Sequence, residues 1–215
     1  MKLIGDKIYL ITDGFCYKPP IGCFGFATSV LIKDDLTILF DTGSYGLRDE
    51  IKKIKKVYNI DYVVVSHLHF DHCSNLDLFT SSSTKIIISD KELEYYKDYK
   101  NKDMDLFPFF DEIKDKLDIQ TVNDGERVSK NCKIIFSPGH TKGHISLEVV
   151  DKGKKYLLCG DSIKTRKELG VFPHNTNAYD IMQAKNTRLQ LLKNYKHLIF
   201  GHDTFQFKKF KLRRF

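Results

Sequence analysis

Three histidines and an aspartate fall within six positions, directly after a short apolar run. The three valines at 63–65 are followed by a serine and then by His67-Leu68-His69-Phe70-Asp71-His72. Imidazole and carboxylate together are the usual ligands of Zn²⁺ and similar ions. In an extended stretch the first two histidines point the same way, and a turn then re-aims the aspartate and the last histidine toward a second position. The pattern favours a strand ending at a metal site over a solvated histidine-rich loop.

Three further ligand-type residues follow apolar runs elsewhere in the chain. His140 comes after the run at 134–136, Asp161 after 156–159, and His202 after 198–200. In all three cases glycine directly precedes the polar residue, which permits a sharp exit from the strand and a close backbone approach. The repeated order of strand, glycine and ligand predicts that all three residues join the same buried centre.

Short apolar runs rich in β-branched residues recur along the chain. They have the length of strands and cover 7–12, 27–32, 37–40, 62–66, 85–89, 133–137, 146–151, 156–159 and 197–200. Several are apolar on consecutive positions, which predicts strands buried on both faces. The chain is expected to be an α/β protein: two sheets packed together, with helices outside.

Helical spacing appears between these runs. Leu47, Ile51, Ile54 and Tyr58 lie on one helical face, so the lysines at 52, 53, 55 and 56 are expected to point to water. Residues 90–117 predict one or two helices broken at Pro108. Residues 178–195 predict another, whose inward residues are expected to be Ile181, Met182, Leu189 and Leu192.

Composition and charge exclude several classes of protein. The 215 residues are 41% hydrophobic, which is enough for a sizeable core. The net charge of the chain is +7, and the last eleven residues contribute five of these charges because they hold five lysines and arginines and no acidic residue. The rest of the chain therefore has nearly equal numbers of positive and negative charges, and it lacks the basic stripe of a nucleic-acid binder. The apolar runs are too short to span a bilayer. Five scattered cysteines and an N-terminus unlike a signal peptide predict a reduced, cytoplasmic protein without a disulfide framework.

The ordered set of His67, His69, Asp71, His72, His140, Asp161 and His202 resembles the metallo-β-lactamase superfamily of hydrolases, and Asp41 resembles that family's structural first-motif aspartate. The resemblance implies a four-layer αββα sandwich, a single domain over 1–204, followed by a basic and aromatic tail over 205–215. It also implies that His67, His69 and His140 hold one metal ion, that Asp71, His72 and His202 hold a second, and that Asp161 bridges them.

The resemblance implies two divalent metal ions as cofactors. Zinc is expected, with iron and manganese as alternatives. Two such ions lower the pKa of a shared water to about 7 and polarise the bond under attack, so a metal-bridging hydroxide is the expected nucleophile. Asp71 is the expected catalytic residue, orienting that hydroxide and relaying its proton. Cys73 is expected to pack beneath the site.

Individual residues indicate which branch of the family the chain resembles. Asp161 stands where mixed-site β-lactamases carry cysteine, and little chain follows His202 for the helical domain of glyoxalase II. The segment 138–147 is close to the third motif of compact lactonase-like and glyoxalase II-like enzymes. Hydrolysis of an ester, lactone or thioester is therefore expected. The alternatives are a phosphodiesterase or RNA-processing nuclease, and a mono-iron oxygenase like the persulfide dioxygenases.

Substrate contacts are less clearly indicated. The aromatic segment 90–118 predicts either ordinary packing or an apolar lid, and the loop 13–25 is a second candidate wall. By their position in the sequence, Tyr179, His174 and Asn175 are candidate partners for the oxyanion or the leaving group.

The tail over 205–215 is expected either to pack on the domain or to bind nucleic acid. The expected partner is a small-molecule substrate. Binding to nucleic acid is possible but less favoured, and binding to a membrane is not expected. The chain could also form a homo-oligomer.

Overall fold

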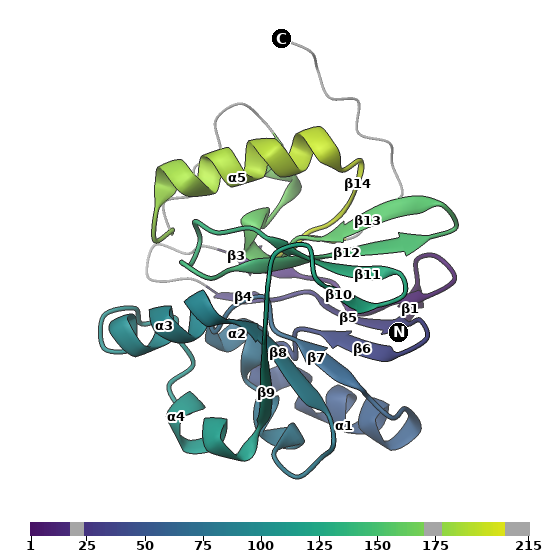
Figure 1. Ribbon diagram of the computed structural model, residues 1–215, viewed down its shortest axis with the longest axis vertical. Helices are drawn as coiled ribbons and strands as arrows, with labels where there is room; N and C mark the ends of the chain where they lie inside the picture. The colour runs from purple at the N-terminus through teal and green to yellow at the C-terminus, as the bar shows by residue number, and fades with distance from the viewer. Residues whose placement is uncertain (18–23, 170–177, 205–215) are drawn as a thin grey trace.

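The computed structural model describes residues 1–17, 24–169 and 178–204, and within them two β-sheets face each other between outer helices (Figure 1). The larger sheet has the order β1-β2-β5-β6-β7-β8-β9 and the smaller one β10-β11-β12-β13-β14. The larger sheet contains β1 (Lys2–Leu3), β2 (Ile8–Thr12), β5 (Ser29–Lys33), β6 (Thr37–Phe40), β7 (Tyr62–Val64), β8 (Lys85–Ser89) and β9 (Asp118–Val122). The smaller sheet contains β10 (Arg127–Ser129), β11 (Cys132–Phe136), β12 (Ile145–Asp151), β13 (Lys154–Leu158) and β14 (His197–Ile199). A separate hairpin pairs β3 (Phe15–Tyr17) with β4 (Phe24–Phe26).

The helices complete the four layers. In the order of the chain they are α1 (Arg48–Val57), α2 (Phe70–Cys73), α3 (Asp90–Tyr99), α4 (Phe110–Ile113) and α5 (Ile181–Asn194). Single 3₁₀ turns cover Tyr45–Leu47, Leu76–Phe79, Lys114–Lys116, Gly160–Ser162 and Arg166–Leu169. Figure 1 shows α1, α3 and α4 on the outer side of the larger sheet and α5 on the outer side of the smaller one. The predicted αββα sandwich is confirmed.

Strands of the larger sheet are buried on both faces, as their consecutive apolar residues predict. In β5, Val30 and Ile32 pack between the two sheets with Ile134 of β11. Leu31 points the other way, into the cluster beneath α1 and α3. Because each central strand contributes to two cores, its side chains anchor both the sandwich and the helical layer.

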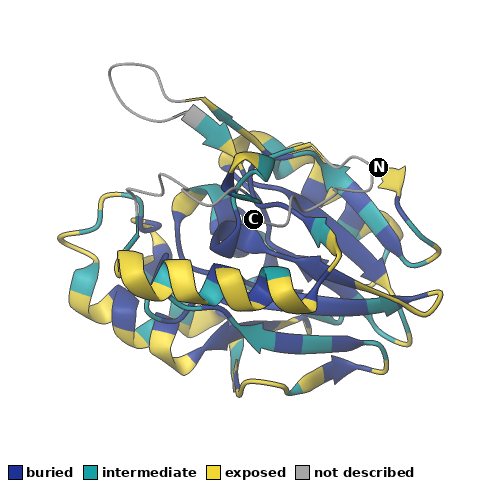
Figure 2. Cartoon of the chain, turned by 90° about the horizontal axis from the view of Figure 1, so that it is seen from above, coloured by how far each residue is buried: buried dark blue, intermediate teal, exposed yellow. Residues whose placement is uncertain are grey.

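The helix spanning 178–195 is rotated from its predicted orientation. Ile181, Met182 and Leu189 were expected to point inward, but they are 58%, 64% and 54% exposed; Leu192 is partly buried, and Leu191 is buried instead. The long helix in the foreground of Figure 2 shows this exposed face. The side of α5 that faces the sheet carries Ala184, Arg188 and Leu191, and the last two are each 4% exposed. The backbone at Ala184 approaches Gly139 so closely that a Cβ on Gly139 would lie 2.2 Å from the Ala184 nitrogen, so a small residue suits each side of this contact.

The other helix predictions are confirmed except at Lys55, which was expected to point to water but donates to the Leu78 carbonyl and lies over the Phe79 ring. In α1, Ile51 and Ile54 are buried, and Leu47 and Tyr58 pack partly against the same core. The segment 90–117 forms α3 and α4, with the break between Tyr99 and Phe110. No helix in the described residues has the length and apolar character needed to cross a membrane.

Asp34 joins the two sheets at the end of the sandwich away from the histidines. It lies between β5 and β6 and accepts hydrogen bonds from Ser129 Oγ (2.9 Å) and from the Asn131 backbone (2.7 Å), beside the β10–β11 turn. Lys7 Nζ donates a further bond of 2.7 Å. Burial raises the pKa of Asp34, but these hydrogen bonds outweigh burial and hold that pKa well below 3.8.

We expect Asp34→Asn to lower the free energy of unfolding at pH 7 by about 1 to 3 kcal/mol. Because the folded pKa is depressed, the ionised form stabilises the fold above the unfolded pKa of about 4, and this stabilisation is lost as pH falls further. The difference between the wild type and Asp34→Asn should therefore shrink below about pH 4. Urea unfolding from pH 7 to pH 3 measures it, with Asp118→Asn, at an exposed position on β9, as control. A difference that does not change with pH would contradict the assignment.

Candidate metal centre

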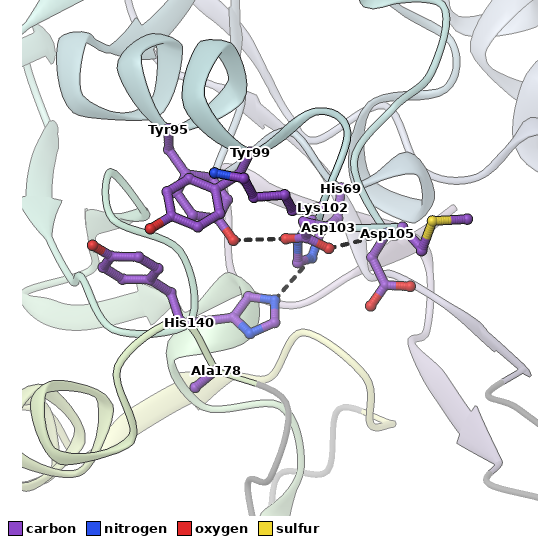
Figure 3. A pocket seen from close by; sticks show the side chains of 10 residues that line it. His69, Tyr95, Tyr99, Lys102, Asp103, Asp105, His140 and Ala178 are labelled. Atoms are coloured by element: carbon purple, nitrogen blue, oxygen red, sulfur yellow. Dashed lines mark hydrogen bonds and ion pairs between the residues drawn. The ribbon is translucent and has the colours of Figure 1, made fainter.

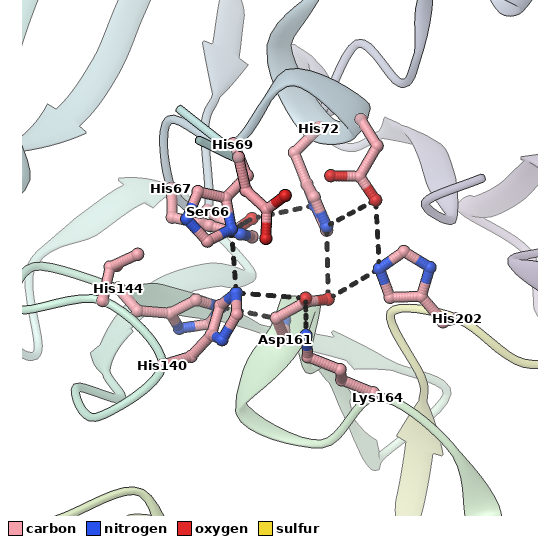
Figure 4. Close-up of polar contacts among 12 residues, drawn as sticks. Ser66, His67, His69, His72, His140, His144, Asp161, Lys164 and His202 are labelled. Atoms are coloured by element: carbon pink, nitrogen blue, oxygen red, sulfur yellow. Dashed lines mark hydrogen bonds and ion pairs between the residues drawn. The ribbon is translucent and has the colours of Figure 1, made fainter. Parts of the chain in front are cut away.

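Four parts of the chain bring their polar residues to one edge of the sandwich (Figure 4). The first is the turn that leaves β7 and enters α2, which carries His67 to His72. The others follow β11, β13 and β14 and supply His140, Asp161 and His202. Neighbouring strands that end at the same edge place their following residues together, and this is where ligands bind in such sheets.

The seven predicted ligands are gathered into overlapping groups. The possible ligand atoms of His67, His69 and His140 lie within 4.8 Å of one another. The same limit holds for the ligand atoms of Asp71, His72 and His202. These are the two ligand sets expected from the sequence, and every residue in them except Asp71 is buried.

Asp161 lies between the two groups. Its Oδ2 is 3.2 Å from His140 Nε2 on one side. Its Oδ1 is 3.2 Å from His72 Nε2 and 3.1 Å from His202 Nε2 on the other. A single carboxylate thus has one oxygen directed toward each group, which is the arrangement needed to bridge two ions.

The buried atoms that lack hydrogen bonds test whether a metal fits. Among the described residues, six buried side-chain atoms lack a hydrogen-bond partner. Thr28 Oγ1, Ser44 Oγ and Asn75 Oδ1 lie outside the predicted ligand set, and the other three are His67 Nε2, His72 Nε2 and Asp161 Oδ1. Leaving such atoms unsatisfied is costly in a folded protein. All three belong to the predicted ligand set and are directed into the cluster. Coordination of a divalent ion would satisfy them, so the residues present fit a metal centre.

Burial and charge shift the pKa values of three of these histidines in different directions. Burial, together with the neighbouring histidines, lowers the pKa of His67 well below 6.5, and burial beside Lys164 does the same for His140. For His72, burial lowers the pKa, but the carboxylates of Asp161 and Asp71 outweigh burial and raise it. Because neutral imidazole is the form that binds metal, His67 and His140 are ready to bind an ion, whereas His72 would release a proton on binding one.

Asp41 holds the centre from behind, as predicted for a structural aspartate. It is fully buried and accepts hydrogen bonds from the Ser66 backbone (2.7 Å) and hydroxyl (2.8 Å). His72 Nδ1 donates to its second oxygen at 2.7 Å. This bond fixes the tautomer of His72 and leaves Nε2 facing the cluster.

Cys73 packs beneath the site, as expected. Its thiol is fully buried and donates to the His69 carbonyl at 3.1 Å.

Glu92 is a buried residue at the centre that sequence reasoning missed. It lies on α3 and accepts hydrogen bonds from the Leu68 backbone (2.9 Å), the Thr141 hydroxyl (2.6 Å) and the Gly143 backbone (3.1 Å). Leu68 lies between two ligands, and Thr141 and Gly143 follow a third. Glu92 therefore ties together two ligand-bearing loops. Its position within a predicted helix carried no signal of this contact.

His144 and Lys164 were also missed as neighbours of Asp161. His144 Nε2 accepts from the Asp161 backbone at 2.9 Å, and its Nδ1 lies 2.7 Å from Ser137 Oγ. Lys164 Nζ is 2.9 Å from Asp161 Oδ2, and its side chain is 17% exposed. The signal for Lys164 was its spacing of three residues from Asp161, since a 3₁₀ turn brings such residues together.

Asp103 orients His69. His69 Nε2 and the Tyr95 hydroxyl donate to Asp103 Oδ2 at 3.0 Å and 2.7 Å, so His69 Nδ1 is left to face the cluster. Burial raises the pKa of Asp103, but these bonds outweigh burial and lower it to about 2. A carboxylate behind a metal-binding histidine fixes its ring and strengthens it as a ligand.

Asp103→Ala should weaken metal binding by about 10- to 100-fold, because His69 then loses the partner that holds its ring. Competition against a chromophoric chelator measures the affinity. Asp98→Ala removes an exposed carboxylate of the same helical segment and serves as the control. Equal affinities for the two variants would show that His69 is held by other contacts.

A pocket of about 470 Å³ opens beside His69 and His140 (Figure 3). Tyr95, Tyr99 and Tyr179 contribute to its walls with Lys102, Asp103 and Met104. Ordinary packing, one of the two predictions for the aromatic segment, is confirmed, because Tyr95, Tyr96, Phe107 and Phe110 are buried in the core and Tyr99 packs against it. Tyr95, Tyr99 and Met104 also line the pocket, and the lid stays a prediction.

The remaining candidates for substrate contact have different outcomes. Tyr179 lines the pocket, and its backbone nitrogen donates to the His140 carbonyl at 2.9 Å. His174 and Asn175 lie outside the described residues, as do the tail 205–215 and the middle of the 13–25 loop. The described part of that loop reaches the centre, since His202 Nδ1 lies 3.3 Å from the Phe15 carbonyl oxygen.

Comparison with known proteins gives a consistent family. The family model described as the metallo-beta-lactamase superfamily matches residues 24–202. The chain is 29% identical over 175 residues to the beta-lactamase-like protein 2 homolog of Caenorhabditis elegans, a match that covers 77% of this chain and 51% of that protein. It is 27% identical over 157 residues to an N-acyl homoserine lactonase of Bacillus cereus, covering 70% of this chain and 59% of the lactonase. The chain thus spans a little over half the length of both relatives.

Two solved structures show the same fold. The crystal structure of a quorum-quenching N-acyl homoserine lactone hydrolase superposes with a TM-score of 0.72 at 22% identity, with 94% of each chain covered. AidC, described as a dizinc quorum-quenching lactonase, superposes with a TM-score of 0.63 at 20% identity, covering 80% of this chain and 69% of AidC.

Proposed function

The chain belongs to the metallo-β-lactamase superfamily, and from this premise we propose that it is a two-zinc hydrolase of a carbonyl ester, lactone or thioester. The observation that carries the proposal is the position of Asp161, with one oxygen near His140 and the other near His72 and His202. A centre for a single ion would not need a carboxylate shared between two complete ligand groups.

Bound at these groups, two divalent ions would supply hydroxide at neutral pH and polarise the carbonyl oxygen of the substrate. His67, His69 and His140 would hold one ion, and Asp71, His72 and His202 the other. Asp71 is the least buried of the seven, and its Oδ2 lies 3.2 Å from His202 Nε2. It can therefore face the substrate side, orient the attacking oxygen and accept its proton at the free carboxylate oxygen.

The substrate class is supported by the relatives and by the pocket. Relatives named as N-acyl homoserine lactonases match the chain in sequence and in fold. The pocket reaches His69 and His140 directly and is lined by tyrosines, as expected for a small substrate with an apolar part. The complete second ligand group favours hydrolysis over the mono-iron oxygenase alternative, which needs only one metal.

Metal analysis and an activity panel test the proposal together. Mass spectrometry of untagged protein should find close to two zinc ions per chain, and the same sample should cleave members of a lactone, ester and thioester panel. Bis(p-nitrophenyl) phosphate tests the phosphodiesterase alternative, and oxygen uptake with glutathione persulfide tests the oxygenase. About one iron per chain with oxygen uptake, or cleavage of the phosphodiester alone, would contradict the proposal.

A further inference from the structure

Three tyrosines form a preassembled aromatic wall in the pocket beside the metal centre. The rings of Tyr95 and Tyr99 stack, with centroids 4.7 Å apart and planes at 17°. Tyr179 stands nearly perpendicular to both, at 5.3 Å and 5.4 Å. Offset stacking and edge-to-face contacts are the favoured arrangements of aromatic rings. The wall is thus held by its own contacts, and a ligand that binds to it need not order the side chains.

The Tyr95 hydroxyl is engaged with a protein partner, since it donates to Asp103 at 2.7 Å. Asp103 in turn accepts a hydrogen bond from His69 at 3.0 Å. The tyrosine wall is therefore tied to a residue of the metal centre, and it offers a ligand ring surface and ring edges directly beside His69 and His140.

Two flexible side chains complete the pocket. Lys102 Nζ lies 5.1 Å from the centroid of the Tyr99 ring, and Met104 is 90% exposed although it lines the pocket. An ammonium group already placed over Tyr99 opposes the binding of a second cation there. A methionine thioether, by contrast, makes favourable contacts with aromatic rings and adapts to their shape.

We propose that this pocket binds a planar aromatic group of the substrate, between the tyrosine wall and Met104. The inference rests on the proposed hydrolysis and adds the substrate class to it. An aliphatic group of equal size would bury a similar area. Only an aromatic ring, however, also gains edge-to-face contacts with the exposed edge of Tyr99 and with the Tyr179 ring, so the geometry of the wall selects for aromatic rings.

A matched pair of ligands isolates the aromatic contribution. N-phenylacetylglycine and N-cyclohexylacetylglycine have the same connectivity and carry no cleavable ester, so binding can be measured apart from catalysis. Calorimetry on the zinc-loaded protein should find the phenyl ligand bound about 3- to 10-fold more tightly. The corresponding pair of N-acyl homoserine lactones should differ similarly in kcat/KM, because the acyl group lies away from the carbonyl under attack.

Substitutions of the wall tyrosines test whether their rings cause the preference for the phenyl ligand. Tyr99→Leu and Tyr179→Leu should each reduce the preference for phenyl, whereas Tyr99→Phe keeps the ring and should retain it. Tyr179 is 44% exposed, so its replacement tests the wall even if Tyr99→Leu folds poorly. Tyr45→Leu, at an exposed tyrosine outside the pocket lining, is the control.

Equal binding of the two ligands by the wild type, or a preference that survives in both leucine variants, would overturn the inference. Tighter phenyl binding without hydrolysis of any lactone, ester or thioester would support the pocket assignment and sink the proposed function instead. The two failures are therefore distinguishable.

Discussion

Asp161→Ala will remove metal and hydrolysis together. If Asp161 bridges two ions as proposed, its loss should reduce the metal content from two ions per chain to one or fewer. The value of kcat/KM should fall by more than about 100-fold, since removal even of an outer-shell partner costs about 10- to 100-fold. The change also leaves the Lys164 ammonium without its 2.9 Å partner beside the histidines. An unpaired positive charge there opposes rebinding of a cation.

Inductively coupled plasma mass spectrometry and kinetics on the same sample measure both effects. Asp161→Asn keeps the shape of the side chain but only one oxygen, so we expect an intermediate metal content. Asp118→Ala, at an exposed position on β9, controls for the purification and should keep both ions. Two ions per chain in Asp161→Ala would disprove the bridging assignment. Normal metal content with lost activity would instead give Asp161 a role in the reaction alone.

The residues that gather at the candidate centre could be predicted from sequence because each of them follows an apolar strand: four follow β7, and one each follows β11, β13 and β14. The order of strand, glycine and ligand at His140, Asp161 and His202 is local, and the strands themselves are short apolar runs. Parallel or neighbouring strands that end at one edge bring such residues together without further information. The four-layer fold followed from the same runs, since consecutive apolar residues require cover on both faces.

Asp103 and Glu92 could not be predicted, because their partners are distant in the chain; Asp41 was identified only through the resemblance to a known family. Asp103 meets His69 across 34 positions, and Glu92 meets Thr141 across 49. Neither contact leaves a local pattern. The strands β9 and β10 were missed for a different reason: β9 is largely polar and lies at the sheet edge, and β10 has only three residues.

Glu92→Ala will destabilise the protein by about 3 kcal/mol or more. The change strips three buried donors, on Leu68, Thr141 and Gly143, of their acceptor in a site that is fully buried. Each unsatisfied buried donor costs about 1 to 3 kcal/mol, partly relieved where water can enter, and the lost side chain leaves a cavity. Urea unfolding measures the difference.

Glu94→Ala, two residues along the same helix, is the matched control. Glu94 forms an exposed ion pair with Lys142 at 2.9 Å, so its removal should change the free energy of unfolding by less than about 0.5 kcal/mol. A loss in Glu92→Ala no greater than this would contradict the role assigned to Glu92.

The effect of metal on stability distinguishes the role of Glu92 from that of the proposed metal ligands. The three hydrogen bonds of Glu92 do not involve the ion, so Glu92→Ala should destabilise the protein with and without chelator. Asp161→Ala should lose instead the part of the stability that a bound metal ion would supply to the folded state, which chelator should remove from the wild type as well. Glu92 joins α3, the turn after β7 and the loop after β11. Glu92 therefore holds His69 and His140 close together before any ion binds. In Glu92→Ala the two loops can move apart, so we expect the affinity for metal to fall as well.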